Sequence, residues 1–295
     1  MNQKPFKKVI LMARPGTKGL EDTLCDLYTY LKRAGIKIGI EVNTKLMLSA
    51  EKEEILSVKE QYRGYDLLIV VGGDGSLLHA AQLAVEHNLP VLGVHRGRLG
   101  FLTDIPPDHL DKIGAVLKGE YSQESRFLLQ AQIYEENKEL TYDLALNDVL
   151  LLPGNLAHMI MFKIFINNEF VCHQRADGLI ISTPTGSTAY ALSGGGPILH
   201  PNLDAIVLVP MFPHTLSSRP IVVDGSSEIE LRISKENRTE AFLSCDGRKR
   251  LSVPEEGHVI VKKHPRALQL IHPEDYNYFT TLREKLHWEK NHTAK

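Results

Sequence analysis

A run of glycines with one acidic residue is the first stretch of this chain that could do chemistry. The run is Gly72-Gly73-Asp74-Gly75, and it stands between an apolar segment at residues 65–71 and apolar residues at helical spacing. In open α/β sheets ligands bind at such strand-to-helix turns, where glycines and a helix N-terminus favour phosphate. Asp74 would repel phosphate, so its presence indicates a proton acceptor or a metal contact. A tight turn without a ligand is the alternative.

A second polar stretch, residues 175–190, contains a buried strand that runs into a turn rich in glycine, serine and threonine. Ser187 or Thr188 could cap a short helix that carries Tyr190. The hydroxyl groups and exposed N–H groups of this turn suit ribose and phosphate oxygens, and the Tyr190 ring could stack on a flat base. Helix capping alone would also explain the hydroxyl groups.

A third polar feature is the pair Asn147-Asp148, which interrupts an apolar run. The pair could bind ribose hydroxyl groups, or it could mark only a strand bulge or edge. The histidines, such as His87 and His200, show no metal-ligand spacing with acidic residues, and they are expected to be surface or structural residues. The glycine run matches neither a Walker A loop nor the dinucleotide-binding fingerprint, and no hydrolase nucleophile elbow is present.

Composition narrows the classes of function. The 295 residues have a net charge of −2 and are 43% hydrophobic, which is typical of a soluble globular protein and does not suggest nucleic-acid or membrane partners. No signal peptide is recognised at the N-terminus, and no apolar run approaches membrane-spanning length. The three cysteines show neither zinc spacing nor a disulfide framework. These features favour a cytoplasmic protein.

The elements that must position these residues follow two different rhythms. Strand-like and helical segments alternate through residues 1–125, which predicts an α/β domain with a parallel sheet and helices on both faces. A polar stretch up to about Gly64 is expected to be helical. Residues 126–271 are dominated by strand-like runs, with turn dipeptides such as Asp246-Gly247, and predict a β-rich domain. Residues 272–295 predict a closing helix that packs back on the first domain.

Together these motifs resemble those of the NAD kinase family, in family order. The stretches that carry the resemblance are Gly72–Gly75, Arg96–Leu102, Asn147-Asp148, Arg175–Gly178, Thr183–Tyr190, Pro210–His214, Ser244–Gly247 and Ile271–Tyr276. The glycine–aspartate turn is shared with diacylglycerol and sphingosine kinases, whereas the Thr183–Tyr190 run is far more specific. The resemblance implies a two-domain enzyme that transfers the γ-phosphoryl group of ATP to the 2′-hydroxyl of the adenosine ribose of NAD, giving NADP.

The resemblance also implies roles for individual residues. Asp74 would be the proton acceptor, and Gly72, Gly73 and Gly75 would form a phosphate loop. Asp177 would lie near the nicotinamide end of NAD and could be supplied across a subunit interface. The positions implied to bind NAD are Asp74, Gly75, His79, Asn147, Asp148, His158, Arg175, Asp177, Thr185, Thr188, Ala189, Tyr190, Ser193 and Arg248.

The family also implies Mg²⁺ bound with ATP rather than at a dedicated protein site, and a homodimer or homotetramer. This chain departs from the family pattern at Asp148, where glutamate is usual, and at His95 and Arg248. Two other functions remain open from the residues. One is a lipid-type kinase that shares the glycine–aspartate turn, and the other is a non-catalytic NAD(P)-binding regulator.

Overall fold

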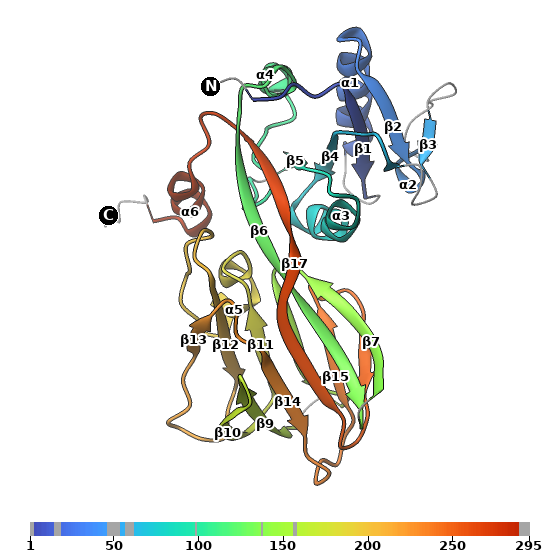
Figure 1. The fold of residues 1–295 in the computed structure, drawn as a ribbon. Coiled ribbons are helices and arrows are strands. Elements are labelled where there is room, and N and C mark those ends of the chain that lie inside the picture. The colour runs from blue at the N-terminus through green and yellow to red at the C-terminus, as the bar shows by residue number, and fades with distance from the viewer. Residues whose placement is uncertain are drawn as a thin grey trace. The chain divides into compact units, whose positions relative to one another are not determined.

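The computed structural model describes residues 3–14, 19–45, 54–56, 62–97, 99–136, 138–155 and 158–288 (Figure 1). The chain forms two compact units, one of residues 1–125 with 268–295 and the other of residues 126–267. Among the described residues, no helix combines the length and the apolar character needed to cross a membrane.

A parallel sheet forms the centre of the first unit. Its strand order is β17-β5-β4-β1-β2-β3, and every neighbouring pair is parallel. The strands are β1 (Lys8–Ala13), β2 (Lys37–Glu41), β3 (Glu54–Leu56), β4 (Leu67–Gly72), β5 (Val91–His95) and the end of β17 (His258–Pro273). Strands β4 and β5 are buried along their whole length, as expected for a sheet covered on both faces.

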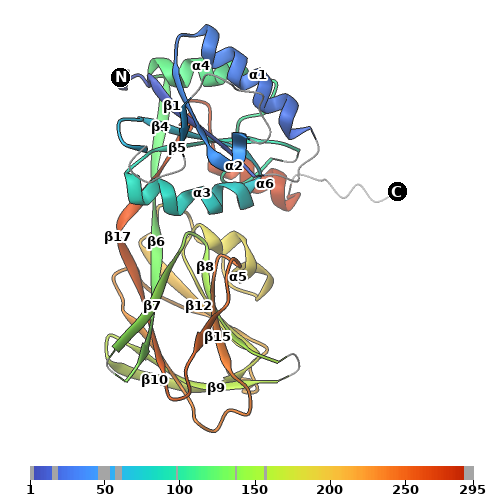
Figure 2. The ribbon, with the colours of Figure 1, turned by 90° about the vertical axis from the view of Figure 1, so that its right-hand side faces the viewer.

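Helices cover both faces of this sheet. The helices α1 (Leu20–Arg33) and α4 (Leu110–Lys118) lie on one face, where their apolar residues share a core with alternate residues of β1 and β4. Helix α3 (Asp74–His87) lies on the other face (Figure 2). The turn between β4 and α3 therefore lies at the carboxyl edge of a parallel sheet, where such folds bind ligands.

One sequence prediction in this unit is wrong. The polar stretch before Gly64 was expected to be helical, but after the short helix α2 (Val42–Lys45) its described residues contain the strand β3. The rest of this prediction, residues 46–53 and 57–61, lies outside the described residues. Strand β3 pairs with β2 in parallel, at the edge of the sheet. Edge strands are commonly short and charged, which explains why the sequence pattern did not reveal it.

The second unit is built from antiparallel strands. Strands β8, β11, β12, β13, β15 and β16 form a sheet in the order β13-β12-β11-β8-β15-β16, and β9, β10 and β14 pair with β17 in the order β10-β9-β14-β17. The bounds are β6 (Tyr121–Glu135), β7 (Lys138–Ala145), β8 (Asp148–Pro153), β9 (Ile160–Ile166), β10 (Glu169–Ala176), β11 (Gly178–Ser182), β12 (Ala205–Met211), β13 (Ile221–Asp224), β14 (Ile229–Ile233), β15 (Ala241–Cys245) and β16 (Leu251–Val253).

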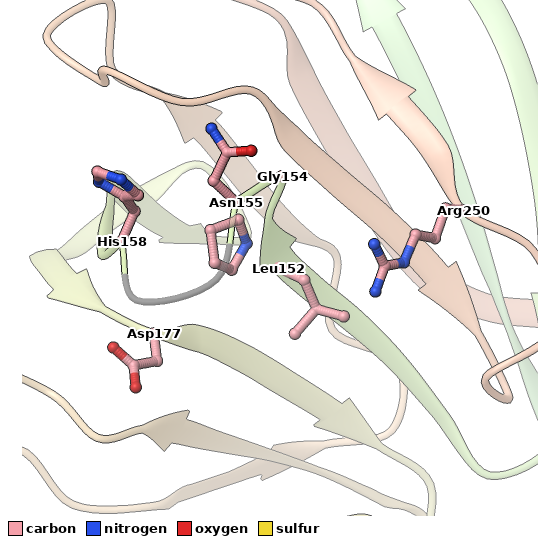
Figure 3. Close-up of a pocket in the computed structure, with 7 residues that line it drawn as sticks. Leu152, Gly154, Asn155, His158, Asp177 and Arg250 are labelled. Carbon is pink, nitrogen blue, oxygen red and sulfur yellow. The ribbon is translucent and has the colours of Figure 1, made fainter.

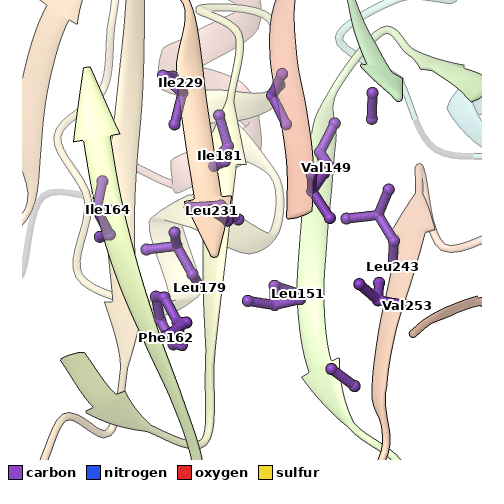
Figure 4. Close-up of a cluster of buried hydrophobic side chains, with 14 of the residues drawn as sticks. Val149, Leu151, Phe162, Ile164, Leu179, Ile181, Ile229, Leu231, Leu243 and Val253 are labelled. Carbon is purple, nitrogen blue, oxygen red and sulfur yellow. The ribbon is translucent and has the colours of Figure 1, made fainter. Parts of the chain in front are cut away.

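One apolar core lies between these strands. Side chains from β8 and β11, such as Val149 and Leu179, meet those from β9 and β14, such as Phe162 and Leu231 (Figure 4). The hairpin between β9 and β10 turns at Asn167 and Asn168, which have φ of 51° and 65°. Asparagine tolerates this left-handed conformation, so the predicted hairpin has the residues that its tight turn requires.

Two long strands connect the units. Strand β6 begins in the first unit and ends in the second, and β17 returns the chain to the first. The second unit ends at Ala267 rather than at residue 271, because Leu270 and Ile271 of β17 pair with β5. The chain then ends in α6 (Tyr278–Leu286), which belongs to the first unit. The predicted fold class, an α/β unit plus a β-rich unit with a returning C-terminal helix, is the one observed.

Candidate active site

The carboxylate of Asp74 lies at the start of α3 and is held by a loop that follows β5. It accepts hydrogen bonds from the backbone N–H of Phe101 at 2.9 Å, from that of Leu102 at 3.0 Å and from the Thr103 hydroxyl at 3.3 Å. An ionised carboxylate has about four acceptor positions. The described residues of the loop occupy three of them. Asp74 is therefore fixed in orientation and retains room on Oδ2 for one more donor.

The three glycines beside Asp74 differ in whether the protein's own packing requires glycine at that position. Gly72 has φ of +153°, and a Cβ there would overlap the Ser76 side chain. By contrast, a Cβ at Gly73 or Gly75 would meet no atom within 4 Å. Both are exposed, and the first N–H groups of α3 have no helical acceptor. Packing therefore does not require glycine at these two positions, whereas close approach of a phosphate would.

Three sequence motifs of the second unit converge around the Asn147-Asp148 turn. The carbonyl of Asn147 accepts hydrogen bonds from the N–H of Thr183 at 2.9 Å and the hydroxyl of Ser182 at 3.1 Å. The Thr183 hydroxyl donates to the Leu146 carbonyl at 2.6 Å. A Cβ at Gly186 would overlap the Asn147 carbonyl, so only glycine lets the hydroxyl-rich turn approach this closely. The structure thus brings Asn147, Asp148 and the Thr183–Tyr190 run together.

The side chain of Asp246 holds the Asn147-Asp148 turn in place through hydrogen bonds to its backbone. Its carboxylate accepts from the N–H groups of Leu146 at 3.0 Å, Asn147 at 2.8 Å and Asp148 at 3.2 Å. The sequence marked Asp246-Gly247 as a turn only. Asp246 has φ of 51°, a left-handed conformation that aspartate tolerates, so the turn signal was correct and the carboxylate's function was missed.

Asp148 is the most strongly perturbed acid of the site. Its side chain is 5% exposed. Burial, together with the nearby negative charge of Asp246, raises the pKa of Asp148 from 3.8 to about 7. Perturbed carboxyl groups of this kind are common at functional sites.

The hydroxyl-rich turn does not cap a helix as the sequence suggested. The short helix α5 (Tyr190–Ser193) begins after Ala189 and has no side-chain cap. The Ser187 hydroxyl instead donates to the Pro184 carbonyl and accepts from the Leu199 N–H, and the Thr188 hydroxyl donates to the Thr185 carbonyl. The bonds to Pro184 and Thr185 close the 3₁₀ turn Gly186–Thr188, and the bond from Leu199 ties it to a later segment. Capping of a helix by Ser187 or Thr188 is therefore a wrong prediction.

Tyr190 and Ser193 are exposed on this turn, and the Tyr190 side chain is 44% accessible. An accessible ring remains available for stacking on a base. Thr185 is buried and accepts from the guanidinium of Arg126 at 3.3 Å. Arg126 is itself 3% exposed, and no sequence pattern marked it.

Asp177 and His158 lie at the other end of β11. They line a cavity of about 620 Å³ together with Leu152, Pro153, Gly154, Asn155 and Arg250 (Figure 3). Asp148 pairs with Ser182 at the end of β11, whereas Asp177 directly precedes its first residue. Five residue steps along this strand, from Asp177 to Ser182, separate the two groups by about 17 Å. The predicted NAD-binding residues of this unit therefore form two clusters.

Three residues of the predicted NAD-binding set, two arginines and one histidine, lie in neither of these two clusters. Arg248 donates to the carbonyls of Leu144 and Cys245 and forms an ion pair with Asp143 at 3.4 Å. These bonds give Arg248 a structural role in the unit, and its predicted ligand contact stays a prediction. Arg175 and His79 are exposed.

Fold and site together define a two-domain nucleotide-binding phosphotransferase. Family models for the ATP-NAD kinase N-terminal and C-terminal domains match residues 9–121 and 146–273. The NAD kinase of Coxiella burnetii (strain RSA 493 / Nine Mile phase I) is 54% identical over 290 residues, 98% of this chain and 97% of the relative. That of Legionella pneumophila (strain Corby) is 49% identical over 99% of each chain. The chain belongs to the NAD kinase family.

Solved structures agree with this assignment. The yeast NADH kinase complexed with NADH has a TM-score of 0.88 at 25% identity, covering 99% of this chain and 91% of that one. An NAD kinase from Archaeoglobus fulgidus in complex with ATP has a TM-score of 0.70 at 24% identity, covering 95% and 98%, and shows the fold alone. The comparisons support neither the lipid-type kinase nor the non-catalytic regulator.

Proposed function

We propose that the protein transfers the γ-phosphoryl group of ATP to the 2′-hydroxyl of the adenosine ribose of NAD, with Asp74 as proton acceptor. Membership of the NAD kinase family supports the reaction. The observation that carries the residue assignment is the Asp74 carboxylate, fixed by three donors and adjacent to glycines that packing does not require.

Phosphoryl transfer depends mainly on positioning and on charge stabilisation. As the bond between the 2′-oxygen and phosphorus forms, the hydroxyl proton must leave, and a carboxylate within hydrogen-bond reach can accept it. The N–H groups of Phe101 and Leu102 hold the Asp74 carboxylate in a fixed orientation, and these bonds leave an acceptor position on Oδ2 for the substrate hydroxyl. Gly73 and Gly75 would let the N–H groups of the turn approach the ATP phosphates.

NAD would be bound by the second unit. Asn147 and Asp148, presented by the turn that Asp246 fixes, would bind ribose hydroxyl groups, and Tyr190 with Thr188 and Ala189 would hold the base. The convergence of these motifs around the Asn147 carbonyl supports this assignment. Gly75, His79, Thr185, Ser193 and Arg248 are further proposed contacts by their family positions.

The proposed metal, Mg²⁺, would arrive with ATP. Hard oxygen ligands such as phosphates suit Mg²⁺, and when bound it neutralises part of the polyphosphate charge. Among the described residues no group of three His, Cys, Asp or Glu side chains is placed to hold a metal. Asp74 has most of its acceptor positions in loop hydrogen bonds, so it fits a proton acceptor better than a metal ligand.

The protein is further proposed to be a cytoplasmic homodimer or homotetramer. The three cysteines, Cys25, Cys172 and Cys245, are free, which suits a reducing compartment. Asp177, which lines a cavity with His158, lies at the far end of β11 from Asn147-Asp148. This separation supports the proposal that Asp177 completes the NAD site of a second copy.

The direct test is to incubate the protein with NAD, ATP and Mg²⁺ and to detect NADP with a strictly NADP-dependent dehydrogenase. The proposal expects NADP to accumulate with time and enzyme. No NADP under varied divalent metals would overturn it. Phosphorylation of diacylglycerol or sphingosine in its place would favour the lipid-kinase alternative.

A further inference from the structure

We propose that His272 is a positioning residue for Asp74, acting through Asp104 and the loop that holds the Asp74 carboxylate. The inference rests on the proposed function, because it takes Asp74 to be the proton acceptor. It concerns only contacts within the first unit, to which His272, Asp104 and Asp74 all belong.

The loop after β5 is attached to the sheet by its backbone. Ile105 forms a parallel bridge with Val94, and the N–H of His95 donates to the Ile105 carbonyl at 2.9 Å. A Cβ at Gly93 would lie 2.8 Å from the Cα of Thr103, so glycine is needed for the loop to pack this closely on the strand. These contacts hold the end of the loop at Ile105.

The tip of the loop carries the three donors to Asp74 that the described residues provide. The N–H of Gly100 donates to the Thr103 carbonyl at 3.0 Å, which closes a tight turn over Phe101 and Leu102. A Cβ at Gly100 would overlap the Asp74 carboxylate, so the turn touches the acid directly. A small shift of this turn would therefore change the orientation of the Asp74 carboxylate.

Asp104 joins this turn to the C-terminal segment. It follows Thr103 directly, and its Oδ2 lies 2.8 Å from Nδ1 of His272. The side chains are 8% and 1% exposed. A carboxylate accepts but does not donate, so Nδ1 of His272 is the donor in this bond. Hydrogen bonds to ionised groups are short and strong when buried.

His272 is itself held in place from several directions. Its ring stacks on that of Tyr276, with centroids 3.9 Å apart and planes at 9°. Its Nε2 lies 3.7 Å from a carboxylate oxygen of Glu124. Ile271, the preceding residue, pairs with Leu92 of the buried strand β5. The histidine thus connects a strand of the sheet to the loop that orients Asp74.

The imidazole has two nitrogens that face different partners, which permits a matched pair of variants. In His272→Asn, the amide nitrogen can take the place of Nδ1 and donate to Asp104. In His272→Gln, the amide reaches toward the position of Nε2 and Glu124. Both variants lose the ring that stacks on Tyr276, so they differ mainly in the bond to Asp104. The exposed residue His109, replaced in His109→Gln, is the control.

We expect His272→Gln to lower kcat about tenfold while KM for NAD and ATP stays within about twofold. His272→Asn should recover most of this loss, and His109→Gln should match the wild type. In an Asp74→Asn background, His272→Gln should cause no further loss, because the two residues act through one carboxylate. Equal kcat for His272→Gln and His272→Asn, or additive losses with Asp74→Asn, would overturn the proposal.

Hydrogen exchange gives a readout that does not depend on the reaction. We expect the amides of Phe101 and Leu102 to exchange faster in His272→Gln than in His272→Asn. Unchanged exchange in both would overturn the inference whatever the activity shows. If Asp74→Asn keeps full turnover, Asp74 is not the proton acceptor. Hydrogen exchange at Phe101 and Leu102 would still show whether the bond between His272 and Asp104 positions the loop. Should His272→Gln not fold, Asp104→Asn is tested by the same criteria.

Discussion

The carboxyl groups of Asp148 and Asp246 lie close together at the Asn147-Asp148 turn and have different tasks. Asp246 accepts three backbone N–H groups and organises the turn, whereas Asp148 is buried beside it with its pKa raised to about 7. A buried carboxyl near a second one keeps its proton more readily. Asp148 therefore changes its charge near neutral pH. Its protonation state at that pH would decide whether it donates to or accepts from a ligand hydroxyl.

This pKa predicts a pH-dependent difference in stability between the wild type and Asp148→Asn. Below about pH 4 the aspartate is protonated in both the folded and unfolded states. As pH rises toward 7, the unfolded state loses the proton while the folded state keeps it, so the wild type loses stability relative to the variant. The expected loss is roughly 1.4 kcal/mol per unit of pKa shift.

Denaturant unfolding of both proteins at several pH values between 4 and 8 measures this difference. The account expects the gap in the free energy of unfolding to change through this window and to level off above about pH 7. Parallel pH profiles for the two proteins would show that Asp148 has an ordinary pKa.

At the scale of elements, the sequence predicted most of what positions the site and missed the contacts between residues far apart in the chain. The apolar run before Gly72 and the helical spacing after Asp74 predicted the β4–α3 turn, because both signals are local. The bonds from Asp246 to the Asn147-Asp148 turn join residues 98–100 positions apart, and no local pattern contains them. The edge strand β3 was missed because its three residues are too few for periodicity.

Gly73→Ala and Gly75→Ala test whether the turn serves a ligand. Neither Cβ would meet an atom of the protein within 4 Å, so neither variant should have a lower melting temperature than the wild type. Gly75→Ala, inside α3, should raise the melting temperature, since helical glycine costs about 1 kcal/mol. If the turn cradles phosphate, KM for ATP should rise about tenfold in both. An unchanged KM would remove the turn from ATP binding.

Asp246→Ala tests the support of the Asn147-Asp148 turn. Loss of its three N–H bonds should lower the free energy of unfolding by about 2–3 kcal/mol and raise KM for NAD about tenfold. Asp224→Ala is a matched control, because Asp224 begins another Asp-Gly turn but is exposed. Equal effects of the two substitutions on KM for NAD would contradict the assigned role of Asp246.

At the scale of the whole molecule, the sequence predicted two units because the chain changes from alternating helix and strand to strands near residue 126. It could not predict that β17 would add a parallel strand to the first unit beside β5, since that pairing joins Leu270 to Val91. The proposed sharing of Asp177 between copies is likewise a property of the assembly, which the sequence of one chain does not encode locally.

Complementation tests that sharing. Asp74→Asn and Asp177→Asn should each be nearly inactive alone. When the two variants are expressed or refolded together as dimers, activity should return to as much as about a quarter of the wild-type level. Random pairing makes half of the dimers mixed, and each mixed dimer has one intact site out of two. A mixed dimer of confirmed composition without recovered activity would show that Asp177 serves its own chain.

The central claim, that Asp74 accepts the proton of the ribose hydroxyl, is tested most directly by Asp74→Asn. The substitution keeps the size of the side chain and an oxygen acceptor for the loop. The account predicts that kcat for NADP formation falls by about 10²–10⁴, while the dissociation constant for NAD, from calorimetry, stays within about twofold. Wild-type turnover in this variant would contradict the account.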